Sequence, residues 1–164
     1  MEKLEIKEVS SKKDFSVFMD LPWDIYKGDS VWVPPLKEAV KGDLDVEKNP
    51  FYKNAKRRLF LAYKNGKAVG RIAAILNNRH NSFHSEKVLF WGFFECINDT
   101  EVSKLLFDEV EKWARALGMD SIRGPCNPST NHSIGMLIDG YDDSPFIMMT
   151  YNPKYYNDLC ERCV

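Results

Sequence analysis

The sequence predicts a mixed α/β fold, in which helices flank a central sheet with antiparallel and parallel strands. Asn65-Gly66 separates two runs of strand-forming residues, at 57–64 and 67–76, and this dipeptide suits the positive φ angles of a type I′ hairpin turn. A third apolar strand, an amphipathic helix and a further strand then follow in succession. Because a strand–helix–strand unit of this size forms a right-handed crossover, its two strands are expected to be parallel.

The N-terminal part begins with a strand and then becomes helical. Apolar and charged residues alternate over residues 4–9, which is typical of a strand with one buried face. Ser10 or Ser11 then caps a helix with apolar residues at helical spacing, and Pro22 predicts a kink or break in it. The two prolines of VWVPPL force an extended turn, and Pro35 fits the first turn of a short helix.

The central part holds the strongest strand and the strongest helix. Residues 88–96, VLFWGFFEC, are almost continuously apolar, which indicates a strand buried on both faces. Gly92 in this strand permits a bulge or a close approach of another backbone. Asn98 or Asp99 caps the next helix, whose apolar residues follow a period of 3.6, and Gly118 ends it. A strand over the following seven residues completes the crossover.

Composition and charge narrow the range of functions. The 164 residues fit a single domain, 1–164, with a substantial core. The 23 basic and 24 acidic residues nearly cancel, which argues against nucleic acid or an anionic membrane as the main partner. No membrane partner is therefore expected. With no apolar run long enough to span a bilayer and no signal peptide, a cytoplasmic location is expected. The oligomeric state stays open.

The four cysteines fit reduced thiols, and no metal is expected. Cys160 and Cys163 form a CxxC motif at the end of a predicted helix. A redox CxxC usually opens a helix instead, where the helix dipole lowers a thiol pKa. A zinc site would need a second closely spaced pair, which the sequence lacks.

The segment from Gly124 to Tyr156 is predicted to be irregular and partly buried. It holds 4 of the 8 prolines and 3 of the 9 glycines, together with the apolar runs MLI and FIMM. Its polar residues Asn127, Ser129, Thr130 and Asn131 are candidates for binding a substrate. Alternatively, they form Asx- and Ser/Thr-turns within an Ω-like loop that seals a sheet edge. A last helix ends the segment.

Six stretches of the chain together resemble one known group of proteins. The stretches are DLPWDIYKGDSVWVPPL, NPFYKNA, GRIAAILNNRHN, GFFEC, RGPCNPSTN and YNPKYY. They resemble the poorly characterised YghO-like subgroup of the GNAT acyltransferase superfamily, over nearly the whole chain. The resemblance implies a GNAT-like mixed central sheet and transfer of an acyl group from acyl-CoA to a small-molecule amine. Because YghO-like proteins are longer and a GNAT sheet continues for two more strands, the chain is expected to be an N-terminal portion without those C-terminal strands.

The chain departs from the GNAT pattern where coenzyme A normally binds. In GNAT proteins a glycine-containing loop opens the helix after the fourth strand, and its backbone N–H groups cradle the CoA pyrophosphate. The corresponding residues 95–106 contain no glycine. Asp99 and Glu101 place negative charge at the helix N-terminus, where it complements the helix dipole and repels a phosphate.

A second departure concerns the general acid. Many GNAT enzymes have a tyrosine in the last helix, near the thiolate leaving group, and Cys160 aligns with that position. Tyr155 and Tyr156, one turn earlier, are candidate substitutes.

Glu95 is the candidate general base, because burial at the end of an apolar strand raises a carboxylate pKa towards neutrality. Its alternative role is to solvate the strand end or cap the helix. Two functions therefore remain. The first is a GNAT-type N-acyltransferase, and the second is a non-catalytic GNAT-like module that binds a ligand or a partner. The glycine-free loop favours the second, whereas the polar segment favours a ligand of some kind.

Overall fold

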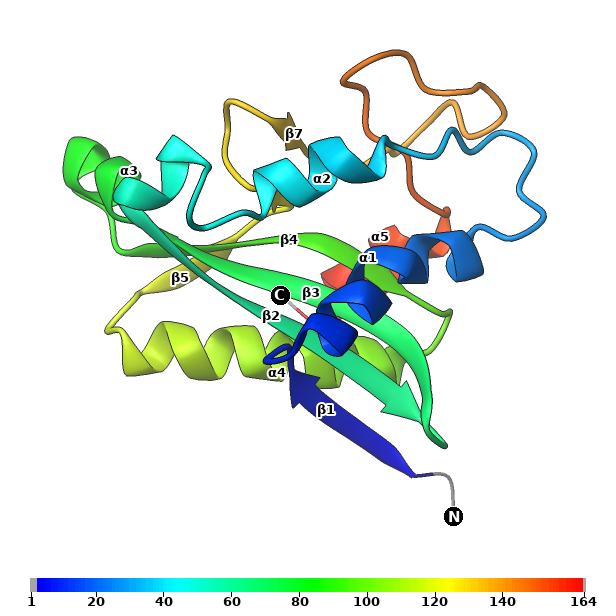
Figure 1. The fold of residues 1–164 in the computed structure, drawn as a ribbon, viewed down its shortest axis with the longest axis horizontal. Coiled ribbons are helices and arrows are strands. Elements are labelled where there is room, and N and C mark those ends of the chain that lie inside the picture. Colours follow the sequence, from blue (N-terminus) through cyan, green and yellow to red (C-terminus); the bar gives the residue numbers. More distant parts are fainter. Residues whose placement is uncertain (1–2, 164) are drawn as a thin grey trace.

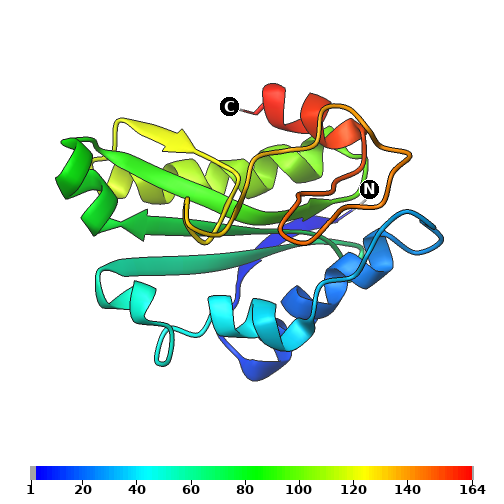
Figure 2. The same ribbon diagram turned by 90° about the horizontal axis from the view of Figure 1, so that it is seen from above.

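The computed structural model describes residues 3–163, so Met1, Glu2 and Val164 of the predicted domain lie outside it. A five-stranded sheet separates two helical layers (Figures 1 and 2). In spatial order its strands are β1 (Leu4–Glu8), β2 (Ala55–Lys64), β3 (Lys67–Asn77), β4 (Val88–Cys96) and β5 (Ser121–Arg123). The first three pairings are antiparallel and β4–β5 is parallel, which confirms the predicted mixed sheet.

The helices cover both faces of this sheet, and two short strands form a separate hairpin. The helices are α1 (Lys12–Ile25), α2 (Lys37–Asp43), α3 (Asn78–His84), α4 (Thr100–Ala116) and α5 (Tyr155–Glu161), with a 3-10 turn at Pro50–Lys53. The hairpin consists of β6 (Cys126–Asn127) and β7 (Ser133–Ile134). Figure 2 shows α4 and α5 on one face of the sheet and α1 and α2 on the other.

Local sequence signals explain how these elements begin and turn. Asn65 and Gly66 have φ angles of 53° and 80°, as expected for the type I′ turn between β2 and β3. Ser11 caps α1, and the Ser11 hydroxyl accepts a hydrogen bond from the Asp14 backbone N–H at 3.1 Å. The predicted break at Pro22 does not occur, since α1 continues to Ile25.

The predicted start of the second helix also differs from the structure. The structure begins α2 at Lys37, so Pro35 lies in the extended segment before the helix and not in its first turn. The reason is that the following residue, Leu36, adopts extended backbone angles as the N-cap.

The helix α4 packs its apolar stripe on one face of the sheet. Val102, Leu106 and Val110 are fully buried at a spacing of four residues, against side chains of β2, β3 and β4. On the opposite face Phe18 of α1 is fully buried in a second cluster. Each such side chain contributes about 1.5–3 kcal/mol through burial, so both faces of the sheet are firmly covered.

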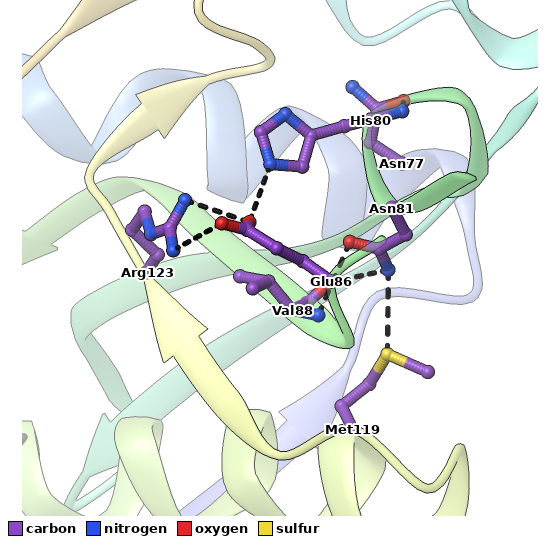
Figure 3. A network of polar contacts seen from close by, with 7 residues as sticks. All are labelled: Asn77, His80, Asn81, Glu86, Val88, Met119 and Arg123. Atoms are coloured by element: carbon purple, nitrogen blue, oxygen red, sulfur yellow. Dashed lines mark hydrogen bonds and ion pairs between the residues drawn. The ribbon is translucent and has the colours of Figure 1, made fainter. Parts of the chain in front are cut away.

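A polar network fixes the closed end of the β4–β5 pair (Figure 3). The Asn81 side chain pairs with both backbone groups of Val88, donating to its carbonyl at 3.0 Å and accepting from its N–H at 3.2 Å. Glu86 bridges His80 and Arg123, at 3.0 and 3.1 Å. Hydrogen bonds from these two residues lower the pKa of Glu86. The start of β4 is thereby tied to α3 and to β5.

At its other end β4 separates from β5. In the described part of the chain, the two strands pair only at Val88–Phe90. Beyond that, the β3–β4 register shifts, and Phe93 adopts a φ of 49°, which marks the bulge that Gly92 permits. Gly92 also allows the close approach, because a Cβ there would lie 1.9 Å from the carbonyl oxygen of Cys126. The opening between β4 and β5 contains the candidate site.

Candidate active site

A cavity of about 240 Å³ lies where β4 leaves β5. Its wall joins the two faces of the sheet, because it takes residues from α1, from β3 and β4, and from the segment after β5. The wall includes polar and aromatic side chains, among them Tyr26, Trp32, Asp43, Arg71, Trp91, Glu95, Asn127, Tyr151 and Tyr156. A concave site with a few converging polar groups is the usual form of a small-molecule site.

Glu95 and Arg71 form a buried ion pair at this cavity. They are paired positions of β4 and β3, and the Arg71 Nη2 and Glu95 Oε1 atoms are 3.5 Å apart. Only 6% of the Arg71 side chain and 14% of the Glu95 side chain are exposed. Arg71 also donates from Nη1 to the carbonyl of Phe18 at 2.6 Å. The pair is therefore held in place by both strands and by α1.

Burial makes Glu95 a stronger base than an ordinary carboxylate. Its pKa is raised above the usual 4.5 by desolvation, while Arg71 and a hydrogen bond from Tyr156 partly oppose the rise. Arg71 stays charged, since a guanidinium does not lose its proton in proteins. Burial and a raised pKa are the properties expected of a general base, so that role for Glu95 stays a prediction.

Tyr156 connects Glu95 to the free edge of β4. Its hydroxyl donates to Glu95 Oε2 at 2.7 Å and accepts from the backbone N–H of Cys96 at 2.9 Å. Burial raises the pKa of Tyr156 well above its ordinary value, so the hydroxyl keeps its proton. Tyr155, the other candidate, donates to the Cys96 carbonyl at 2.8 Å and is not part of the cavity wall. The two tyrosines together satisfy the backbone of β4 where β5 no longer does.

The polar residues of the irregular segment are distributed unevenly. Asn127 lines the cavity, and its side-chain oxygen accepts from the Phe93 N–H at 2.6 Å. Ser129 is buried outside the cavity wall, while Thr130 and Asn131 are exposed to solvent. Of the four predicted substrate-binding residues, the fold brings only Asn127 to Glu95.

Ser129 belongs to a local constellation with His132 and Asp43. Ser129 Oγ is 2.8 Å from His132 Nδ1, and His132 Nε2 is 4.0 Å from Asp43 Oδ1. The Ser129 hydroxyl also accepts from the Asn131 N–H at 3.2 Å, and its carbonyl accepts from the His132 N–H. These contacts are those of a Ser/Thr-turn, so they support the turn alternative for Ser129 over substrate binding.

Several residues of the cavity were not among the sequence candidates. One feature of the sequence could have pointed to Arg71, because it is the single charged residue within the apolar run VGRIAAIL. Arg71 Nε and Trp91 Nε1 are the two buried side-chain nitrogens of residues 3–163 without a hydrogen-bond partner. Both residues line the cavity, and a buried unpaired donor is costly unless a ligand or solvent accepts from it. The Arg71 side chain packs over Phe18 of α1 and the Trp91 side chain against Phe107 of α4, so the two nitrogens belong to opposite faces of the sheet. A ligand with an acceptor oxygen fits beside Arg71.

Coenzyme A in the usual GNAT mode does not fit this chain. The Asp99 Oδ1 atom accepts from the backbone N–H groups of Glu101 and Val102, at 3.0 and 3.3 Å, so these donors at the start of α4 are already used. Asp99 carries negative charge there, partly balanced by Lys64 at 3.0 Å. The start of α4 is thus unsuited to a pyrophosphate in its geometry as well as in its glycine-free sequence.

Residues 3–163 contain no group of three or more His, Cys, Asp or Glu side chains arranged to hold a metal ion. In that same part of the chain, no helix has the length and apolar character needed to cross a membrane.

Solved structures identify the fold. AAC(6')-Iy in complex with the bisubstrate analogue CoA-S-monomethyl-acetylneamine has a TM-score of 0.52 and 18% identity, covering 79% of this chain and 83% of that one. An acetyltransferase from Streptococcus agalactiae has a TM-score of 0.50 and 22% identity, covering 71% and 68%. The chain therefore has the GNAT fold, as the sequence resemblance implied.

Two curated proteins are similar in sequence. Protein YghO of Escherichia coli is 30% identical over 92% of this chain, and the bacterial ceramide synthase of Caulobacter vibrioides is 31% identical over 97%. The chain is a homologue of YghO. It spans 38% of the length of YghO and 42% of that of the ceramide synthase. No protein-family profile matches the chain.

Proposed function

We propose that this chain carries the acyl-transfer centre of an N-acyltransferase, in which a primary amine attacks an acyl group within the cavity beside β4. The observation that carries the proposal is the buried Glu95 carboxylate, with its raised pKa and its hydrogen bond from Tyr156. One relative is named a ceramide synthase, and a ceramide is an amide of a long-chain amine. We therefore assign a long-chain primary amine as the acceptor.

The proton transfers follow from the contacts of Glu95. An amine attacks only after its ammonium form has lost one proton to solvent, and Glu95 takes the second proton from the nitrogen as the bond to the acyl carbon forms. The nitrogen forms a bond to the acyl carbon, and the bond from that carbon to the leaving atom breaks. Tyr156 gives its proton to the leaving atom and recovers one from Glu95, to which its hydroxyl is already hydrogen bonded at 2.7 Å. The carboxylate is then free for the next cycle.

Arg71 suits the acyl carbonyl. Within residues 3–163 its Nε atom is a buried donor without a partner, beside Glu95, and the carbonyl oxygen gains negative charge as the amine attacks. Aromatic rings of Tyr26 and Trp32, stacked with centroids 4.6 Å apart, form an apolar wall on the side of α1. No step is assigned to coenzyme A, because the start of α4 does not fit its pyrophosphate.

The second candidate is a GNAT-like module that binds a ligand without catalysis. It is favoured by the Asp99 cap on α4 and by Asn127, which occupies the Phe93 N–H at the bulge of β4. In this reading the cavity holds the long-chain amine, and Glu95 serves as its counter-ion.

The two candidates differ in turnover. The 164-residue chain is incubated with detergent-dispersed hexadecylamine and an acyl thioester, and the amide is measured by mass spectrometry. We expect Glu95→Gln to lower the rate at least about 100-fold, the lower range for loss of a general base, and the exposed Glu47→Gln to leave it unchanged. Full activity in Glu95→Gln would overturn the assignment. Amine binding without amide formation by the unaltered chain would favour the second candidate.

A further inference from the structure

An exposed set of large apolar side chains lies on two segments that border the cavity. We define the apolar rim as Val33, Leu36, Phe146, Ile147, Met148 and Met149. Their exposed fractions are 53%, 79%, 83%, 96%, 71% and 59%. Single exposed apolar residues are common, but six on two neighbouring segments mark an interaction surface.

The rim is built by two segments that are far apart in sequence and fastened together in space. The Ser144 hydroxyl donates to the Val31 carbonyl at 2.9 Å, and the Tyr151 hydroxyl donates to Asp29 Oδ2 at 2.7 Å. Figures 1 and 2 both show the loop before α5 beside the loop that follows α1. Contacts at both ends of the 144–151 stretch therefore hold the rim on the body of the protein.

The rim is continuous with the cavity. Val33 and Met149 belong both to the rim and to the cavity wall, and the neighbouring prolines Pro35 and Pro145 also line the cavity. A ligand that enters or leaves must pass over these side chains. A protein bound across the rim would close this entrance, whereas a lipid surface would supply an apolar ligand directly to it.

The charges around the rim indicate what kind of surface it meets. Residues 30–36 and 144–153 contain no charged side chain, while Asp139, Asp142 and Asp143 lie on the same loop just before the second segment. These carboxylates are repelled by an anionic bilayer. Attraction must therefore come from apolar burial, which is consistent with the near-zero net charge that argued against electrostatic membrane binding.

We propose that the apolar rim docks on the surface of a zwitterionic phospholipid bilayer, with Phe146 to Met149 inserted at the boundary between headgroups and acyl chains. The mouth of the cavity then opens against the lipid. Under the proposed function, this contact brings the cavity to its substrate, since a long-chain amine resides in a bilayer. The docking itself does not depend on catalysis.

Sedimentation with phosphatidylcholine vesicles tests the docking. We expect the 164-residue chain to co-sediment, binding to persist in 0.5 M salt, and anionic lipid to give no increase. The double variant Phe146→Ser/Ile147→Ser should bind at least about tenfold more weakly, since it loses two of the rim's largest apolar contacts. Phe83→Ser is the matched control, because Phe83 is 82% exposed on α3, away from the rim, and should bind as the unaltered chain does.

Three results would overturn the inference. They are no vesicle binding by the unaltered chain, unchanged binding by the double variant, or rim-dependent self-association in sedimentation velocity, which would assign the rim to a second copy. The acylation assay in detergent separates the two proposals. Activity without vesicle binding removes only the docking, and vesicle binding without activity removes only the proposed reaction.

Discussion

The backbone N–H of Phe93 donates a hydrogen bond to the side-chain oxygen of Asn127 over 2.6 Å. Phe93 lies at the bulge of β4, between the positions Gly92 and Glu95 that pair with β3. The contact takes the place of a strand-to-strand hydrogen bond, on the edge of β4 that no longer pairs with β5. It also fastens the irregular segment after β5 to the strand that carries Glu95.

Asn127→Ala tests this fastening. Loss of one partly buried hydrogen bond should lower the free energy of unfolding by about 1–2 kcal/mol and should speed hydrogen exchange at the Phe93 amide. Urea unfolding and exchange measured by NMR give the two quantities. Thr130→Ala, exposed in the same segment, is the control and should change the unfolding free energy by less than about 0.5 kcal/mol. Unaltered exchange at Phe93 in Asn127→Ala would contradict the assigned contact.

The pH dependence of the proposed reaction should follow Glu95. Because its pKa is raised by burial, the acidic limb of kcat/KM is expected above pH 4.5, with the rate rising as the carboxylate ionises. The Tyr156 hydroxyl donates to the ionised form and so favours it. Tyr156→Phe removes that donor, and the limb should move to higher pH. A limb that stays in place would show that Glu95 is not the titrating base.

The capping box of α1 makes a prediction about acid stability. Hydrogen bonds from Lys7 and Ser11 lower the pKa of Asp14 to about 2, from an ordinary value of 3.8. A depressed folded-state pKa stabilises the fold above the unfolded value, and this contribution is lost as pH falls towards 2. Asp14→Asn should therefore lower the urea midpoint clearly at pH 7 and only slightly near pH 2.

The matched control for Asp14→Asn is Asp24→Asn, on an exposed position of the same helix. Its urea midpoint should follow that of the unaltered chain at both pH values. An equal deficit of Asp14→Asn at pH 7 and pH 2 would contradict an ionic origin of the cap.

Local chemistry made much of the fold predictable. The Asn-Gly turn, the apolar β4 strand and the amphipathic α4 helix each carry a signal within a few residues, and the mixed sheet follows from their order. The start of α2 was misplaced because a proline fits both a first helical turn and the extended segment before it. At Pro22 the expected break competes with packing, and Phe18, Met19 and Leu21 are buried on the same helix.

The sequence predicted a residue of the candidate site only where its local context was distinctive. Glu95 stands out at the end of an apolar strand, but Arg71 matters because β3 places it opposite Glu95, and such a pairing depends on register. Whether Tyr155 or Tyr156 reaches Glu95 depends on the rotation of α5 about its axis. The local sequence does not determine that rotation. Likewise, the polar run after β5 turns back on itself at Ser129, so only Asn127 reaches the cavity.

The occupied N-terminus of α4 leads to a prediction about coenzyme A. Since Asp99 uses the N–H groups of Glu101 and Val102, the nucleotide part of coenzyme A should gain little there. Calorimetry is expected to give dissociation constants for coenzyme A and pantetheine that differ by less than about fivefold, the equivalent of 1 kcal/mol.

Asp99→Gly frees both donors and removes the charge, so it should strengthen binding of coenzyme A and leave binding of pantetheine unchanged. It should also lower the unfolding free energy by up to about 1 kcal/mol through the weaker cap. Coenzyme A that binds the unaltered chain 100-fold more tightly than pantetheine would show that another part of the protein holds the pyrophosphate.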